Sequence, residues 1–221
     1  MAGDEGVAMI VLHDYWRSSA AWRVRIGLGL LGLAWESRPV DLLAGGQRGT
    51  ANLSRNPQGL VPTVEGDGLV LTQSLAILEY LDETRGPVLL PSDAPGRARV
   101  RRLAHAIAME IAPVANLRVR QRVAAISGGA MTEWDWVREV VAPGLDAVEA
   151  MLSDDPGPLC HGESPGLADA CLVPQVYNAR RVGLGPAGRW PRTAAIVAAL
   201  SDHPAFAAAH PDRFAPNGAT P

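Results

Sequence analysis

The feature that most constrains the fold is a change in apolar periodicity about 85 residues into the chain. Before this point, short β-rich runs alternate with helical patterns, whereas every long segment after it shows helical spacing alone. Residues 85–96 contain three prolines and two glycines, a composition typical of a linker. The chain is therefore predicted to have two domains, residues 7–85 and 97–221, joined by a linker at 86–96.

The N-terminal part has the pattern of an α/β domain. Helices are predicted to begin at Ser18–Ser19, where the hydroxyls suit an N-cap, and at 72–74. Pro62 favours an irregular or edge position for its strand. The order strand, helix, strand, helix, strand, strand, helix is the layout of a thioredoxin-like domain. Strands are predicted at 7–13, 35–42 and, as a hairpin around an acidic turn, 60–64 and 69–71.

The C-terminal part has no strand pairs in its pattern. Helical spacing of apolar residues predicts an all-helical domain, with helices in the segments 97–123, 131–153, 167–182 and 191–208. The predicted fold class is thus an α/β thioredoxin-like N-terminal domain followed by an all-α C-terminal domain.

Composition excludes several classes of function. All 20 cationic residues are arginines, which excludes Schiff-base, P-loop and general-base lysines, and a net charge of −3 predicts no nucleic-acid partner. Two cysteines, and histidines without metal-ligand spacing, predict no metal site. There is no apolar run long enough to cross a membrane and no basic N-terminal signal. A cytoplasmic protein without a membrane partner is expected.

Three short segments of the α/β part are candidates for binding an anion. Ser18 and Ser19 stand at a helix N-terminus, where unpaired N–H groups and the helix dipole favour a thiolate or phosphate, although Ser18 could also be an N-cap only. Gln73–Ser74 has the same ambiguity. The bond before Pro62 is a candidate cis bond, of the kind found at tight structural positions.

Taken in order, these segments resemble the zeta-class glutathione transferases, the maleylacetoacetate isomerase family. Residues 17–26 read RSSAAWRVRI, close to the class signature R-S-S-C-x-W-R-V-R-I, and the similarity extends from about residue 10 to the end of the chain. Further matching stretches are Asn56–Pro57, 61–63, 73–81, 89–91, 168–176 and 178–181.

The resemblance implies a glutathione-dependent enzyme that is usually a homodimer. Ser18 would hydrogen-bond the glutathione sulfur, with Ser19 beside it. In the family's reaction, the thiolate adds to the cis double bond of maleylacetoacetate or maleylpyruvate, and elimination after rotation gives the fumaryl isomer. The residues that match positions holding the tripeptide are Gln47, Val61, Pro62, Gln73 and Ser74.

A small dianionic substrate requires cations, and the resemblance assigns Arg17, Arg118 and Arg181 to it. Arg118 and Arg122 are four residues apart and are expected to share a helix face. The arginines between 97 and 102 are expected to form a solvated or dimer-facing surface.

The chain departs from the family pattern at several positions. Ala20 replaces the signature cysteine, Ala112 and Ala115 replace polar residues that relatives often carry, and Gly166 replaces a threonine helix cap. Two tryptophans, Trp134 and Trp136, are expected at the core and its rim. The remaining candidates are expected to be structural: Cys160 and Cys171 as buried free thiols, and His13 as a packing residue.

Four readings of the function remain open from the sequence. The isomerase of a maleyl-type keto acid is favoured because the arginines suit an anionic substrate. The alternatives are a glutathione transferase that conjugates or dehalogenates small electrophiles, a double-bond isomerase of secondary metabolism, and a binding module without catalysis. A low-molecular-weight thiol other than glutathione also remains open.

Overall fold

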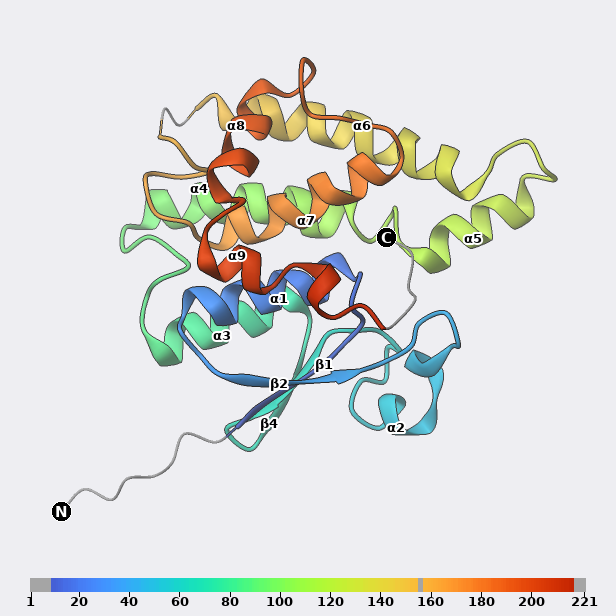
Figure 1. The fold of residues 1–221 in the computed structure, drawn as a ribbon, viewed down its shortest axis with the longest axis horizontal. Coiled ribbons are helices and arrows are strands. Elements are labelled where there is room, and N and C mark those ends of the chain that lie inside the picture. The colour runs from blue at the N-terminus through green and yellow to red at the C-terminus, as the bar shows by residue number, and fades with distance from the viewer. Residues whose placement is uncertain (1–8, 155–156, 217–221) are drawn as a thin grey trace.

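The computed structural model describes residues 9–154 and 157–216. The first half is a four-stranded sheet with helices packed against it, and the second half is a stack of helices (Figure 1). The fold class predicted from the sequence is confirmed. The predicted segment 7–13 lies partly outside the described residues, and the observed strand covers Ile10–Asp14.

The sheet has the strand order β2-β1-β3-β4, with β1 and β2 parallel and the other pairs antiparallel. Pro62 was expected at an irregular or edge position. It lies in an irregular stretch directly before β3, which confirms the first alternative, whereas β3 itself lies inside the sheet between β1 and β4 and is not an edge strand. Because the proline stands before the first ladder residue, its missing N–H removes no sheet hydrogen bond. The strands are β1 (Ile10–Asp14), β2 (Trp35–Pro39), β3 (Thr63–Gly66) and β4 (Leu69–Thr72).

Helices α1 (Ser19–Leu30) and α3 (Ser74–Arg85) lie side by side between the sheet and the helical half (Figure 1). Gly27 permits this approach, since a Cβ at this position would overlap the side chain of Leu78. A 3-10 turn, η1 (Gly46–Arg48), and the short helix α2 (Thr50–Leu53) follow β2. Strand β2 ends at Pro39, three residues earlier than predicted.

Two of the predicted long helices are broken by proline. The segment predicted at 97–123 begins at Ala94, continues as a π-helical segment and restarts after Pro113. The segment predicted at 191–208 is interrupted after Leu200 and resumes as a new helix at Pro204. The elements are α4 (Ala94–His105), η2 (Ala106–Ile111), α5 (Leu117–Ile126), α6 (Glu133–Leu152), α7 (Leu167–Arg181), α8 (Pro191–Leu200), α9 (Pro204–Ala208) and η3 (Pro211–Arg213).

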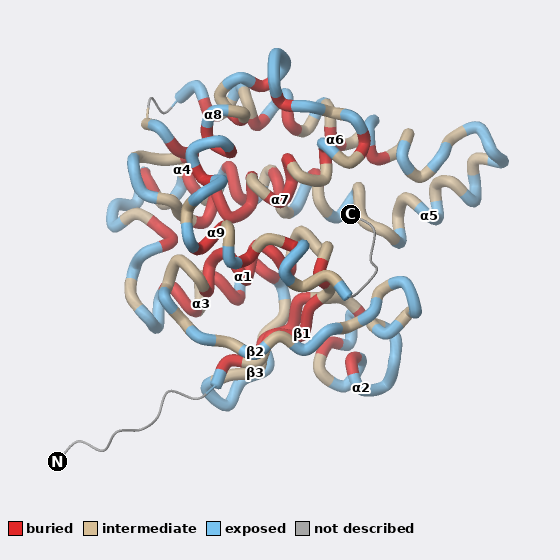
Figure 2. Tube along the Cα trace, in the orientation of Figure 1, coloured by how far each residue is buried: buried red, intermediate tan, exposed pale blue. Residues whose placement is uncertain are grey.

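The two halves share one hydrophobic core. Helix α1 packs directly against α7, and the buried cluster runs without a break from β1 to α9. Figure 2 shows this continuity as buried residues in α1, α4 and α7, whereas residues at the C-terminal end of α5 are exposed. Both cysteines, Cys160 and Cys171, are buried free thiols, as expected. The shared core holds the surfaces of α1, α6 and α7 that enclose the site described next, while α5, which has no buried residue, packs against α6.

Two features are absent from the part of the chain that the structure describes. There, no helix is both long and apolar enough to cross a membrane. The same residues contain no group of three or more His, Cys, Asp or Glu side chains placed to hold a metal ion.

Candidate active site

Two adjoining pockets lie where the helical half meets the N-terminus of α1. The larger has a volume of about 550 Å³ and the smaller about 150 Å³. Because they share part of their lining, they form one continuous cleft. The shared lining residues are Ser18, Ser19, Leu42, Leu43, Ala112, Asn116 and Leu117.

Ser18 stands at the junction of the two pockets. It is the N-cap of α1, and its Oγ accepts a hydrogen bond of 3.3 Å from the backbone N–H of Ala21. Since the hydroxyl accepts in this bond, its own proton remains able to donate to an anion in the cleft. Capping and anion binding are therefore compatible roles of the same side chain.

The larger pocket is formed mainly by backbone features of the thioredoxin-like half. The Val61–Pro62 peptide bond is cis, Gln73 has a φ of 68°, and Ser74 begins α3. All of these residues and Gln47 line the larger pocket. Oε1 of Gln47 is buried and has no hydrogen-bond partner among the described residues, and Nε2 of Gln73 donates to Oε1 of Gln58 at 2.8 Å. The structure thus brings together all the residues expected to hold the tripeptide.

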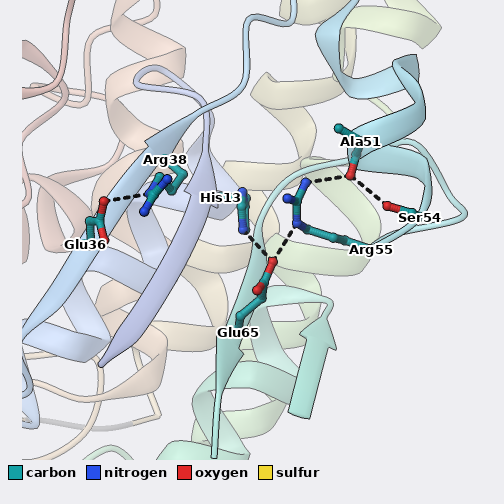
Figure 3. A network of polar contacts seen from close by, with 7 residues as sticks. All are labelled: His13, Glu36, Arg38, Ala51, Ser54, Arg55 and Glu65. Atoms are coloured by element: carbon teal, nitrogen blue, oxygen red, sulfur yellow. Dashed lines mark hydrogen bonds and ion pairs between the residues drawn. The ribbon is translucent and has the colours of Figure 1, made fainter. Parts of the chain in front are cut away.

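A polar network supports the segment that leads into Val61–Pro62. Glu65 on β3 accepts a hydrogen bond of 2.6 Å from Nε of Arg55 and lies 2.8 Å from Nε2 of His13 on β1 (Figure 3). Nη1 of Arg55 also donates to the carbonyl of Ala51 in α2. His13 lines neither pocket. Through Glu65, His13 connects β1 to Arg55 in the segment that precedes the pocket wall.

The smaller pocket contains three arginines, two of which lie against the indole of Trp134. Arg17, Arg120 and Arg181 all line it. The guanidinium carbons of Arg120 and Arg181 lie 4.3 and 5.4 Å from the ring centroid of Trp134, within the range of cation–π attraction. Burial, together with repulsion from Arg17, lowers the pKa of Arg181. Burial and Arg17 also lower the pKa of Arg120, despite the attraction of Glu133. A bound anion would relieve this repulsion.

Of the three arginines that the resemblance assigns to the substrate, Arg118 lies apart from Arg17 and Arg181. It lines the larger pocket, and Arg120 takes the place beside Arg181. Residues two apart on a helix point about 200° away from each other, so α5, which borders both pockets, presents Arg118 to one and Arg120 to the other. Of the earlier arginines, Arg101 and Arg102 pair with Glu79 and Asp154.

Sequence reasoning also missed three other residues of the smaller pocket. Gln175 and Asn178 lie on α7, six and three residues before Arg181, and this spacing places all three on one helix face. The third is Trp134, expected to pack at the core or its rim, which is 39% exposed and forms part of the pocket wall. The spacing on α7 was a usable signal, whereas nothing in the sequence pointed to Trp134.

Comparisons with known proteins agree with this architecture. Family models described as glutathione S-transferase, N-terminal domain, and glutathione S-transferase, C-terminal domain, match residues 17–84 and 97–208. The maleylacetoacetate isomerase of Rhizobium meliloti (strain 1021) is 53% identical over 210 residues, which cover 93% of this chain and 98% of the relative. The chain belongs to the zeta-class glutathione transferases, the maleylacetoacetate isomerase family.

Solved structures of zeta-class relatives have the same fold. The maleylacetoacetate isomerase of Anaeromyxobacter dehalogenans 2CP-1, crystallised with dicarboxyethyl glutathione and citrate in its active site, is 44% identical, with a TM-score of 0.84 and coverage of 97% of this chain and 99% of that one. A maleyl pyruvate isomerase described as a bacterial zeta-class enzyme is 38% identical, with a TM-score of 0.88 and coverage of 95% and 100%.

The departures from the zeta-class pattern fall mostly on the cleft. Ala20 lines the larger pocket, Ala115 the smaller, and Ala112 both. At these three positions the wall is small and apolar. Gly166, by contrast, caps α7 away from the cleft, and its backbone N–H donates to Asp169 at 2.9 Å.

Proposed function

We propose that this chain is a glutathione-dependent cis–trans isomerase of a maleyl-type keto acid, which converts maleylacetoacetate or maleylpyruvate into the fumaryl isomer. One observation carries the proposal: Ser18, at the N-terminus of α1, lies in the wall shared by the larger pocket and the smaller, arginine-lined pocket. A sulfur atom beside Ser18 would therefore face an anionic substrate directly.

The larger pocket is the proposed glutathione site. The buried, unpartnered Oε1 of Gln47 fits this assignment, because a polar tripeptide would supply its missing donor. Val61 ahead of cis-Pro62 would pair with the cysteinyl backbone, and Gln73 with Ser74 would take the γ-glutamyl carboxylate at a helix N-terminus. When bound, glutathione supplies the thiolate that adds reversibly to the double bond.

The proposed role of Ser18 is to stabilise this thiolate. A free thiol with a pKa of about 8.5 is only a few per cent ionised at pH 7, and lowering the pKa by about two units requires about 2.7 kcal/mol in favour of the anion. One hydrogen bond from the Ser18 hydroxyl and the partial charge of the α1 N-terminus together supply energy of this order. Ser19, the next residue, lies in the same wall.

The smaller pocket is the proposed substrate site. Arg17 and Arg181, together with Arg120 rather than Arg118, would bind the two carboxylates, with Trp134 packed against two of the guanidinium groups. The relative from Anaeromyxobacter dehalogenans supports this assignment, because dicarboxyethyl glutathione and citrate both carry several carboxylates. Isomerisation by thiol addition needs no metal and no strong base from the protein.

Three further expectations belong to the same proposal. Residues 7–85 would hold glutathione, residues 97–221 would supply the substrate pocket, and 86–96 would link them. The enzyme would act in the cytoplasm, a reducing compartment that suits the free thiols Cys160 and Cys171. It would be a homodimer, which size-exclusion chromatography with light scattering tests directly.

The test of the proposed function is isomerisation of maleylpyruvate and maleylacetoacetate, followed by absorbance with and without glutathione. Turnover that depends on glutathione is the expected result. If glutathione binds tightly in calorimetry but neither keto acid is isomerised, the proposal is wrong and conjugation or dehalogenation of small electrophiles takes its place. If glutathione does not bind, its assignment to the larger pocket is wrong as well.

A further inference from the structure

Arg23 is a buried cation to which the scheme above gives no role. It lies on α1, five residues after Ser18, is 2% exposed and forms part of the wall of the larger pocket. Nη1 of Arg23 donates a hydrogen bond of 2.6 Å to Oγ of Ser74. Its Nε and Nη2 atoms are buried and have no partner among the described residues.

Arg25, on the same helix, differs from Arg23 in having a carboxylate partner. Arg25 is equally buried, but its Nη1 lies 2.6 Å from Oδ2 of Asp14, and its Nη2 donates to the carbonyl of Trp16. Arg23 has no such carboxylate among the described residues. A buried charge without a counter-ion is costly, so either a ligand supplies the missing anion or the fold carries the penalty permanently.

The hydrogen bond between Arg23 and Ser74 has only one possible direction. A guanidinium group has no acceptor, so Oγ of Ser74 must accept, and the hydroxyl proton of Ser74 is left to donate elsewhere. Ser74 is also the first residue of α3, where the backbone N–H groups have no partner within the helix. Both kinds of donor are placed where the larger pocket can use them.

We propose that Arg23 is the counter-charge for the α-carboxylate of the γ-glutamyl group, and that it acts through Ser74 as a positioning residue. It fixes the direction of the Ser74 hydroxyl and adds a full positive charge behind the partial charge of the α3 N-terminus. This inference rests on the assignment of the larger pocket to glutathione. It makes recognition of the glutamyl end depend on a residue of α1, the helix that also carries Ser18.

Calorimetry with two ligands tests the proposal. Glutathione carries the carboxylate, whereas cysteinylglycine lacks the whole glutamyl unit. Arg23→Met keeps most of the side-chain length and removes the charge, and we expect it to weaken glutathione binding about 30-fold or more while changing cysteinylglycine binding by less than about twofold. Arg85→Met, at the other end of α3 and outside both pockets, is the matched control and should change neither affinity.

A double-mutant cycle separates positioning from general support of the fold. If Arg23 acts through Ser74, Ser74→Ala should add little to the loss already caused by Arg23→Met. Arg23→Lys should restore part of the affinity. In the isomerase assay, Arg23→Met should raise the KM for glutathione far more than it lowers kcat at saturation. Equal weakening of both ligands by a folded Arg23→Met variant would overturn the proposal, as would unchanged affinity for glutathione.

The test does not depend on the stability of the variant. If Arg23→Met does not fold, the wild-type enzyme is compared with glutathione and with its glutamyl α-amide. Equal affinity for the two would show that the carboxylate has no counter-charge and would overturn the proposal. Glutathione binding that depends on Arg23 in a protein without isomerase activity would instead refute the proposed function and leave this inference standing.

Discussion

The two pockets of the cleft are built in different ways. In the larger pocket, the decisive features are backbone features: a cis peptide bond, a positive φ at Gln73 and the start of α3. In the smaller pocket, the decisive groups are long arginine side chains from the β1–α1 loop, α5 and α7, the last two of which lie against Trp134 of α6.

The difference explains which residues could be found from the sequence. A site made of backbone features is encoded by short motifs, because each motif sets its own local geometry. A site made of converging side chains depends on how each helix is rotated, and an error of two residues moves a charge from one pocket to the other, as with Arg118 and Arg120.

The largest expected effect concerns Ser18, which lines both pockets. Ser18→Ala should lower kcat for maleylpyruvate about 10- to 100-fold, because the thiolate loses its hydrogen bond from the hydroxyl. Isomerisation assays followed by absorbance at saturating glutathione measure this kcat. Ser201→Ala, an exposed serine after α8, is the control. A normal rate in the Ser18 variant would remove Ser18 from the mechanism.

Replacing single arginines of the two pockets with alanine should show whether their roles differ. Arg181→Ala and Arg120→Ala should each raise the KM for a dicarboxylate about tenfold or more, because a charged hydrogen bond to a carboxylate is lost. Neither should change the KM for a neutral electrophile in a conjugation assay by more than about twofold. Arg118→Ala should leave the dicarboxylate KM unchanged. A large dicarboxylate effect in Arg118→Ala would show that the pockets are not divided as described.

A smaller effect is expected from the indole that orders two of the cations. Trp134→Leu should raise the dicarboxylate KM a few-fold, since each cation–π contact at a partly exposed site contributes about 0.5–1 kcal/mol. Trp134→Phe, which keeps an aromatic face, should recover most of the affinity. If leucine and phenylalanine are equivalent, the ring only fills space.

The smallest expected effect concerns acid stability of the helical half. Hydrogen bonds from Arg189 and Trp190 lower the pKa of Asp146 to about 2. The folded-state pKa is thus below the ordinary value of 3.8, so the ionised group stabilises the fold above about pH 4, and this contribution is lost as the pH falls from 4 toward 2.

Thermal unfolding of Asp146→Asn between pH 2.5 and 6 measures this contribution. The difference in Tm between wild type and variant should be greatest near pH 6 and shrink toward pH 2.5. A difference that does not change with pH would mean that the ionised carboxylate of Asp146 contributes nothing specific.

Much of the fold followed from local patterns. The hairpin around residues 65–68, the N-cap at Ser18 and the all-helical second half are each encoded by residues close together in the chain. The errors came from proline. Pro62 was expected at an irregular or edge position, but the strand that follows it lies inside the sheet. Two predicted helices are interrupted close to Pro113 and Pro204, although their apolar spacing continues across the interruptions.

By itself, the sequence determined the fold class, the family and the backbone-built larger pocket, because motifs such as Ser18–Ser19 and Gln73–Ser74 fix local conformation wherever the rest of the chain goes. Only the tertiary structure decided that Arg120 lies near Arg181, that both contact Trp134, and that Arg23 is buried with no carboxylate partner among the described residues. These facts depend on the packing of α1, α5, α6 and α7 around one shared core, and contacts between residues far apart in the chain leave no local pattern to read.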